Sequence, residues 1–452
     1  MNFLLVLMAL LIIVTIINKS VNDYISKFVL LTFSGYWGVS LGASTFSPYG
    51  IYEIHTSSYI LLLLGFLSFA FGMSTVRYKS IKMEVNRSYF DNCISSILSS
   101  KVFLCLLLFS IIYLFKYATI AIAVASLQGH ADVTDQFNLI FQGNDLAQQI
   151  YGYLLTPLFH VSLVLMSYYV INFKRIGLKY LLQFIVCLLN LLIFIAIGGG
   201  RSTVVIVALY LLIVYVFFAP SKSLFKFSFK KSFYLVLVTF LVIYAVSLVT
   251  NYRDAGTFFI EDKTESDGQG LELLTRYSLL PYVMFDYGMQ HDYLGKFGLQ
   301  LGKASFLGFD FWLYLPMRIL GFPYETSINV VDYLEETWIP YDKSGTVANY
   351  AYTGLMYHYL DFGIIGVILL PFIFGIVFRR IIISSYKYTT FSSLLLLSMC
   401  FFLTMHSIFT CYLIKPWTGL YLTLLFILNF FEKKKLLGST RSRFERSKSI
   451  CE

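Results

Sequence analysis

Three consecutive glycines and an arginine stand between two apolar runs at residues 198–202. Gly199 and Gly200 allow the backbone to approach a ligand closely and to take up positive φ angles. The next helix is expected to begin just after Arg201, so its first N–H groups face the same spot and suit an anion. Arg201 adds a forked donor whose geometry matches a phosphate. The pattern predicts a phosphate-binding turn, with a tight turn and an interfacial arginine anchor as the alternative.

Three further arginines are candidates for the same task. Arg253 follows the eighth apolar run and is expected at the same depth as Arg201. Two guanidinium groups at that level would form a cradle for a diphosphate. Arg276 and Arg318 lie further along the same polar segment and are additional diphosphate-binding candidates. The alternative for each is a structural ion pair with one of the many acidic residues of the segment.

His358 and Asp361 are three positions apart at the start of the ninth apolar run, so both lie on one face of the expected helix. A histidine beside a carboxylate can act as a general base or bind a sugar hydroxyl. Tyr352 and Tyr357 precede the pair and are candidates for contact with a sugar. The alternatives are a capping or arginine-pairing role for Asp361 and a belt of interfacial tyrosines.

A looser set of candidates lies in the long polar segment. His291 is a third possible base, with Asp286 and Asp292 nearby in the sequence. Trp312 belongs to an aromatic run and is a candidate for stacking on a sugar. The outer side carries no DxD-like motif, and the chain has no CxxC or Cys/His ligand spacing, so no metal and no other cofactor is expected.

The elements that must position these residues are apolar helices. The chain of 452 residues is 58% hydrophobic and 13% charged, against about 25% charged residues in an average soluble domain. Because an apolar stretch of about 20 residues crosses a bilayer as a helix, the sequence predicts an all-α polytopic integral membrane protein. About 11 runs qualify: 3–18, 27–45, 57–76, 102–126, 152–172, 180–198, 203–219, 232–250, 356–378, 391–413 and 417–431.

Positive charge gives the orientation of these helices. If the connections are taken alternately, 24 of the 34 Lys and Arg residues fall on one side, which is therefore expected to be cytoplasmic. The connections at 46–56 and 127–151, the turn at 198–201 and the long polar segment fall on the other side. The net charge of +9 is thus explained by topology, and nucleic acid is not an expected partner.

The long polar segment after the eighth run is the main feature outside the membrane. Residues 251–351 contain 14 of the 25 acidic residues but only seven of the 34 basic ones. A loop of this length inside a compact protein is usually folded and functional. We expect a helical bundle over 1–250, a large outer loop with short interfacial helices over 251–355, further membrane helices over 356–431 and a basic cytoplasmic tail over 432–452.

These features, in this order, resemble the O-antigen polymerase (Wzy) family of oligosaccharide repeat-unit polymerases. The resemblance is carried by the turn at 198–202, the outward Arg253, the long outer loop and the run at 349–366 that enters a helix. It covers roughly residues 198–370, and the rest of the chain agrees only in hydropathy, helix number and basic inner loops. The arginine-proline signatures of some members are echoed only loosely by Pro316 and Arg318.

The resemblance implies a GT-C-like, membrane-embedded glycosyltransferase in the inner membrane of a Gram-negative bacterium, with its active face in the periplasm. Such an enzyme transfers a growing glycan from undecaprenyl diphosphate to the next lipid-linked repeat unit in lipopolysaccharide biosynthesis, without nucleotide or haem. Its partners would be membrane lipids, a chain-length regulator and a flippase of the same pathway. The alternatives are an O-antigen ligase and a flippase for lipid-linked oligosaccharides. Transporters are often built from internal repeats, and the sequence shows none, so the flippase is the less favoured alternative.

Overall fold

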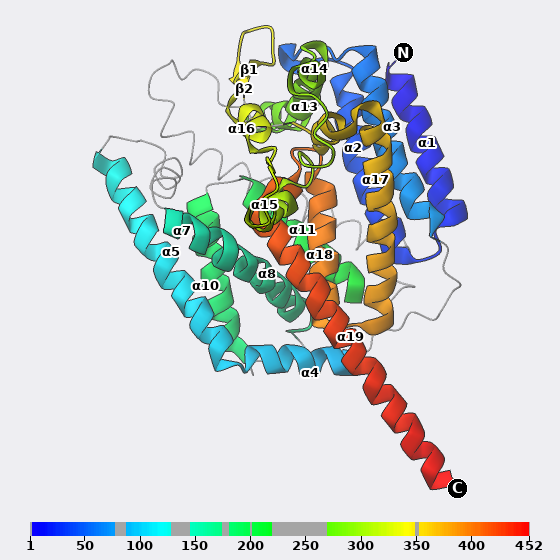
Figure 1. The fold of residues 1–452 in the computed structure, drawn as a ribbon, viewed down its shortest axis with the longest axis vertical. Coiled ribbons are helices and arrows are strands. Elements are labelled where there is room, and N and C mark those ends of the chain that lie inside the picture. The colour runs from blue at the N-terminus through cyan, green and yellow to red at the C-terminus, as the bar shows by residue number, and fades with distance from the viewer. Residues whose placement is uncertain are drawn as a thin grey trace. The chain divides into compact units, whose positions relative to one another are not determined.

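The computed structural model describes residues 2–76, 87–127, 145–173, 180–198, 201–218, 269–348 and 352–451. These residues are helical except for loops and one short hairpin of β1 (Ile339–Pro340) and β2 (Val347–Ala348) (Figure 1). The chain forms two compact units. The first comprises residues 1–84, 271–387 and 400–428, and the second comprises residues 85–270, 388–399 and 429–452.

The first unit contains a group of long apolar helices. They are α1 (Asn2–Ser20), α2 (Tyr24–Ser44), α3 (Thr56–Thr75) and α17 (Gly354–Tyr388). α1 packs on both α2 and α3, and α2 also contacts α3. Asp23 caps α2 by accepting the N–H of Ser26 at 2.8 Å, and its carboxylate also pairs with Arg379 of α17.

The surface of α1 illustrates why these helices suit a membrane. Val6, Ala9 and Ile13 recur every three or four positions and are buried, yet Leu4 and Leu11 on the other face are 64% and 67% exposed. Leaving a leucine side chain in water instead of burying it costs about 1.5–3 kcal/mol. A helix that is apolar all round and packed on one face is therefore suited to lipid on the other.

Short elements form the outer segment of the first unit. They are α13 (Gln269–Gln290), α14 (Tyr293–Phe297), α15 (Leu307–Ile319), α16 (Ile328–Glu336) and the hairpin β1–β2. Two one-turn helices, η1 (Pro48–Gly50) and η4 (Tyr412–Ile414), belong to the same unit, and η4 contacts α15. The short helices expected in the loop are therefore present.

The sequence predicts a helix that ends at Pro281, and this prediction is wrong because α13 continues through Pro281 to Gln290. A proline inside a helix costs about 3 kcal/mol, since it removes one hydrogen bond and crowds the preceding turn. Residues 282–285 are all at least 94% buried. Burial of these large side chains offsets the cost of the proline, so tertiary packing overrides the local preference.

α17 changes direction near its beginning. Phe362 and Gly363 have non-helical backbone angles, and Gly363 lies at φ +61° and ψ −145°. This conformation is open to glycine and strained for any other residue. The break separates a short helical segment, residues 354–361, from the long apolar part of α17.

The second unit is built from α4 (Arg87–Leu98), α5 (Lys101–Leu127), α7 (Asp145–Ile150), the π-helical turn η2 (Tyr151–Leu155), α8 (Thr156–Ile171), α10 (Leu181–Gly198) and α11 (Arg201–Phe218). α10 contacts α5 and α8, and α8 also contacts α11. Leu107, Leu158, Val186 and Cys187 form a buried cluster among these helices. α4 was not expected, because its apolar residues occupy only one face of a short helix.

Two helices contribute residues to both units: α18 (Phe391–His406) and α19 (Pro416–Cys451). Each expected span overlaps a helix except 232–250, which lies outside the described residues, and the span expected at 391–413 is an α-helix only as far as His406. Among the described residues, five helices are long and apolar enough to cross a membrane, and three apolar helices are shorter. These helices indicate a polytopic helical membrane protein.

Candidate functional site

The segment between α14 and α15 is fastened to the start of α17. Asp361 is fully buried, and its carboxylate accepts the backbone N–H groups of Ala304 at 2.9 Å and Ser305 at 2.8 Å. The N–H of Leu301 donates to the backbone carbonyl of Asp361 at 3.1 Å. Because a buried carboxylate requires hydrogen-bond donors, Asp361 holds this segment in place, although the donors lie in a turn before α15 and not in the first turn of a helix.

His358 reaches the same segment from one turn earlier. Its Nδ1 lies 2.6 Å from the hydroxyl oxygen of Ser305, and the Ser305 carbonyl accepts the thiol of Cys411 at 3.4 Å. His358 and Asp361 therefore share Ser305 as a partner, as expected for side chains on one helix face. In this structure the pair positions the outer segment on α17.

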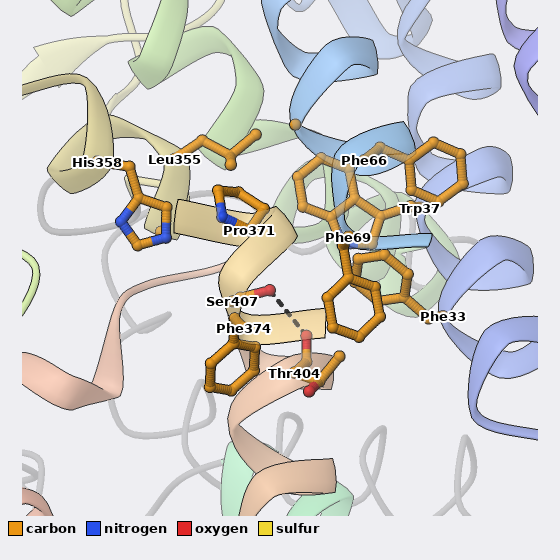
Figure 2. A pocket seen from close by; sticks show the side chains of 12 residues that line it. Phe33, Trp37, Phe66, Phe69, Leu355, His358, Pro371, Phe374, Thr404 and Ser407 are labelled. Atoms are coloured by element: carbon orange, nitrogen blue, oxygen red, sulfur yellow. Dashed lines mark hydrogen bonds between the residues drawn. The ribbon is translucent and has the colours of Figure 1, made fainter. Parts of the chain in front are cut away.

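A small cavity of about 50 Å³ lies beside His358. Figure 2 shows aromatic side chains of α2 and α3 around it, including Trp37 and Phe69, with Ser407 and Thr404 as its other polar residues. Ligand pockets usually measure about 300–1,000 Å³, whereas one water occupies about 30 Å³. The cavity has room for water and not for a sugar ring.

Arg276, a candidate diphosphate ligand, is engaged in the fold. It pairs with the carboxylate of Asp342 and donates to the backbone carbonyl of Tyr49 at 3.2 Å. Burial alone raises the pKa of Asp342, but hydrogen bonds from Ser344, Thr346 and Arg276 together hold that pKa below its usual value. Arg276 thus joins α13 to two outer segments, as in the ion-pair alternative.

Arg318 is in a different environment. It lies exposed at the end of α15, where its Nη1 donates to the hydroxyl of Tyr314 at 2.6 Å and its guanidinium lies 5.5 Å from the Tyr314 ring centre. An aromatic ring beneath a guanidinium orients it and leaves the other N–H groups available. Arg318 can therefore bind an anionic group.

The remaining diphosphate candidates are described only in part. α10 ends at Gly198 and α11 begins at Arg201, as the predicted turn requires. Gly199, Gly200 and Arg253 lie outside the described residues, and the Arg201 side chain is likewise undescribed. The diphosphate cradle of Arg201 and Arg253 stays a prediction.

The candidate set around His291 does not come together. His291 is exposed, stacks on Tyr287 with ring centres 3.7 Å apart, and has its Nδ1 2.8 Å from the Tyr287 carbonyl. Asp292 accepts the N–H of Gly295 at 3.0 Å and caps α14. Asp286 pairs instead with His55, at 2.9 Å between Oδ2 and Nδ1.

Sequence reasoning missed His55. The two members of this pair are 231 positions apart, so no spacing rule could join them. The available signal was topological, since both His55 and Asp286 fall on the expected outer side. The connection at 46–56 was therefore a place to search for partners of the outer segment.

The candidate sugar-binding aromatic residues differ in exposure. Tyr352 and Tyr357 are fully buried, and the Tyr352 hydroxyl lies 3.4 Å from that of Tyr293. These two tyrosines belong to the core that supports the outer segment. Trp312 is 41% exposed on α15, while its indole N–H donates to the carbonyl of Pro416 at 3.0 Å.

A second polar cluster was also missed. Asp310 of α15 is buried and accepts the hydroxyl of Tyr324. The ammonium of Lys303 lies 4.7 Å from the Tyr324 ring centre and donates to the Glu325 carbonyl at 2.8 Å. Burial raises the pKa of the Asp310 carboxyl, although Tyr324 and Lys303 act in the opposite direction.

No protein-family model matches the chain, and comparisons with curated proteins and with solved structures find no match. The case for a function therefore rests on the residues described above.

Proposed function

We propose that this polytopic membrane protein is a glycosyltransferase that polymerises lipid-linked oligosaccharide repeat units on the periplasmic face of a bacterial inner membrane. The observation that carries the proposal is the folded outer segment that His358 and Asp361 fasten to α17. An enzyme that joins two lipid-linked substrates needs a fixed platform that holds the reacting groups together.

The chemistry of α15 matches the parts of a lipid-linked sugar. Its exposed apolar side chains include Leu313 at 55% and Ile319 at 75% exposure, which suit a lipid surface. Arg318 lies on the same short helix and suits the diphosphate. Trp312 offers a half-exposed ring at this level for a sugar. The three properties occur together within 13 residues.

α15 is also held closely against the start of α19. A Cβ atom on Gly308 would lie 2.4 Å from the carbonyl oxygen of Lys415, and one on Gly419 would lie 2.4 Å from the carbonyl oxygen of Gly308. Only glycines permit this approach of two backbones. The proposed substrate-contacting helix is therefore fixed at the end of an expected membrane span.

The proposed reaction is an inverting transfer. The hydroxyl of the acceptor unit attacks the anomeric carbon of the donor glycan, and undecaprenyl diphosphate leaves. Arg318 would stabilise the charge that develops on the diphosphate. A general base accepts the proton of the acceptor hydroxyl.

The experiment that tests this proposal is the glycan ladder of cells in which the gene is deleted. Collapse of the ladder to core bearing a single repeat unit supports a polymerase. Loss of all polymer from the core, with lipid-linked polymer accumulating, indicates a ligase instead. Accumulation of single units on the cytoplasmic leaflet indicates a flippase, and an unchanged ladder rejects all three functions.

A further inference from the structure

The pair of His55 and Asp286 has an unequal exposure that an ordinary surface ion pair lacks. The His55 side chain is 62% exposed, whereas that of Asp286 is only 9% exposed. Surface pairs between two exposed groups contribute about 0–1 kcal/mol. Here a buried carboxylate holds an exposed imidazole, so the main effect of the contact is to orient the ring.

Both partners are fixed by their own elements. Asp286 follows the buried residues 282–285 of α13, and its Oδ1 lies 3.4 Å from the side-chain nitrogen of Gln290. His55 immediately precedes α3, and its carbonyl accepts the N–H of Tyr59 at 2.9 Å. The loop that carries His55 is itself held by Arg276, which donates to the carbonyl of Tyr49. The imidazole therefore has a defined place beside α13.

The contact also determines which ring nitrogen is available. When Nδ1–H donates to the Asp286 carboxylate, the lone pair of neutral His55 is on Nε2. Within the described part of the chain, no residue bonds to Nε2 of His55. An exposed imidazole nitrogen with a carboxylate behind it is the arrangement that proton abstraction from a hydroxyl requires.

We infer that His55 is the general base of the glycosyl transfer and that Asp286 is its positioning residue. This inference rests on the proposed function. Nε2 of His55 takes the proton of the acceptor hydroxyl while its oxygen bonds to the anomeric carbon. The bond from that carbon to the phosphate oxygen breaks, and the lipid diphosphate leaves with the electron pair. Asp286 stabilises the imidazolium, which then releases its proton to water.

His291 is the neighbouring alternative, and its geometry is weaker. It follows Asp286 by five positions, so both imidazoles lie near the end of α13. Its Nδ1 faces the carbonyl of Tyr287 in its own helix, at 2.8 Å. A carbonyl stabilises an imidazolium less than a carboxylate does. His55, whose ring is oriented by a carboxylate, is therefore the better placed of the two imidazoles.

The test uses the full-length protein in lipid nanodiscs with lipid-linked repeat units extracted from cells that lack the gene. The rate of chain growth is measured for wild type, His55→Ala, His55→Gln and Asp286→Asn. Glu53→Gln is the matched control, because Glu53 is an exposed ionisable residue of the same loop. Each variant is also melted thermally, so that a loss of folding is separated from a loss of chemistry.

We expect His55→Ala and His55→Gln to lower the rate by about 100-fold or more, with Asp286→Asn also slower and Glu53→Gln at the wild-type rate. Added imidazole should restore His55→Ala at least tenfold, because it replaces the missing base. If the rate of His55→Ala is within twofold of wild type, the inference about His55 is wrong and the proposed function stands. The same holds if His55→Ala is folded and slow but added imidazole does not raise its rate. A wild-type protein that makes no polymer overturns the proposed function as well.

Discussion

At the scale of single residues, the two described candidate arginines of the outer segment differ in what already holds them. Arg276 pairs with a buried carboxylate, whereas Arg318 is exposed and rests on Tyr314. Arg318→Ala should therefore leave the melting temperature unchanged and slow chain growth about tenfold or more, since a charge-assisted hydrogen bond contributes about 1.5–3 kcal/mol.

Arg276→Ala is the comparison variant for this prediction. Its loss leaves Asp342, which is 1% exposed, without its charged partner, so we expect a lower melting temperature. The measurement is a thermal melt of each purified variant beside its polymerisation rate. Equal melting temperatures for the two variants would contradict the distinction between an arginine that pairs with a buried carboxylate and one that is exposed on Tyr314.

Asp310 gives a pH-dependent prediction. Burial raises the pKa of this carboxyl, so the folded state favours the neutral form. That contribution to stability is complete below the unfolded pKa of about 3.9 and is lost as the pH rises through the folded pKa. Asp310→Asn is neutral at every pH, so its melting temperature should rise relative to that of wild type as the pH increases above about 4.

The control for Asp310 is Glu336→Gln, which neutralises an exposed carboxylate of α16. Its melting temperature should follow that of wild type across the same pH range. If Asp310→Asn loses stability relative to wild type as the pH rises, the carboxylate is stabilised in its charged form and the prediction is wrong.

Local spacing explains which residues could be found from the sequence. His358 and Asp361 are three positions apart on one helix, and they do meet a common partner in Ser305. The pairing of His55 with Asp286 depends on two elements that only the fold brings together. Burial could not be predicted either, because the sequence suggests sugar contact for Tyr352 and Tyr357, with an interfacial belt as the alternative, and both are core residues in the structure.

At the scale of elements, the break in α17 sets the direction of the segment that holds His358 and Asp361. Gly363 lies at φ +61°, where a side chain costs about 1–3 kcal/mol. Gly363→Ala should lower the melting temperature and shorten the polymer, because the short helical segment can no longer hold the outer loop. Gly35→Ala is the control, since a Cβ atom there meets nothing within 4 Å and alanine favours a helix by about 1 kcal/mol. A melting temperature of Gly363→Ala at or above that of wild type would contradict this role.

Helix ends were the least predictable part of the elements. The span expected at 391–413 ends as a helix at His406, and the chain then turns through η4 before α19. The end of this helix could not be located from the sequence because the apolar run continues through Leu413 and Ile414. These two residues are buried in a turn that packs against α15. An apolar run shows that residues are buried, and it does not distinguish burial in lipid from burial under an outer helix.

At the scale of the whole molecule, the alternation of positive charge agrees with contacts inside the first unit. The loop at 46–56 and the outer segment were expected on one side, and they meet where the N–H of Tyr52 donates to the Tyr341 carbonyl at 3.0 Å. Arg379 and the connection between α1 and α2 were expected on the other side, and Arg379 pairs there with Asp23. Two independent contacts at opposite ends of the helices therefore follow the same rule.

The same rule leads to a prediction of topology. Lys343, in the turn of the β1–β2 hairpin, and Lys434, on α19, are both exposed. Each is changed to cysteine in a protein whose six native cysteines have been replaced. Lys343→Cys should react with a membrane-impermeant maleimide in cells whose outer membrane is permeabilised and whose inner membrane is intact. Lys434→Cys should react only after the inner membrane is opened, because a tail rich in Lys and Arg is expected to stay in the cytoplasm. The two positions are lysines with similar exposure, so a difference in labelling reports the side of the membrane and not reactivity. The opposite result is labelling of Lys434→Cys while the inner membrane is intact, with Lys343→Cys protected. It would place the outer segment in the cytoplasm and contradict a polymerase that works in the periplasm.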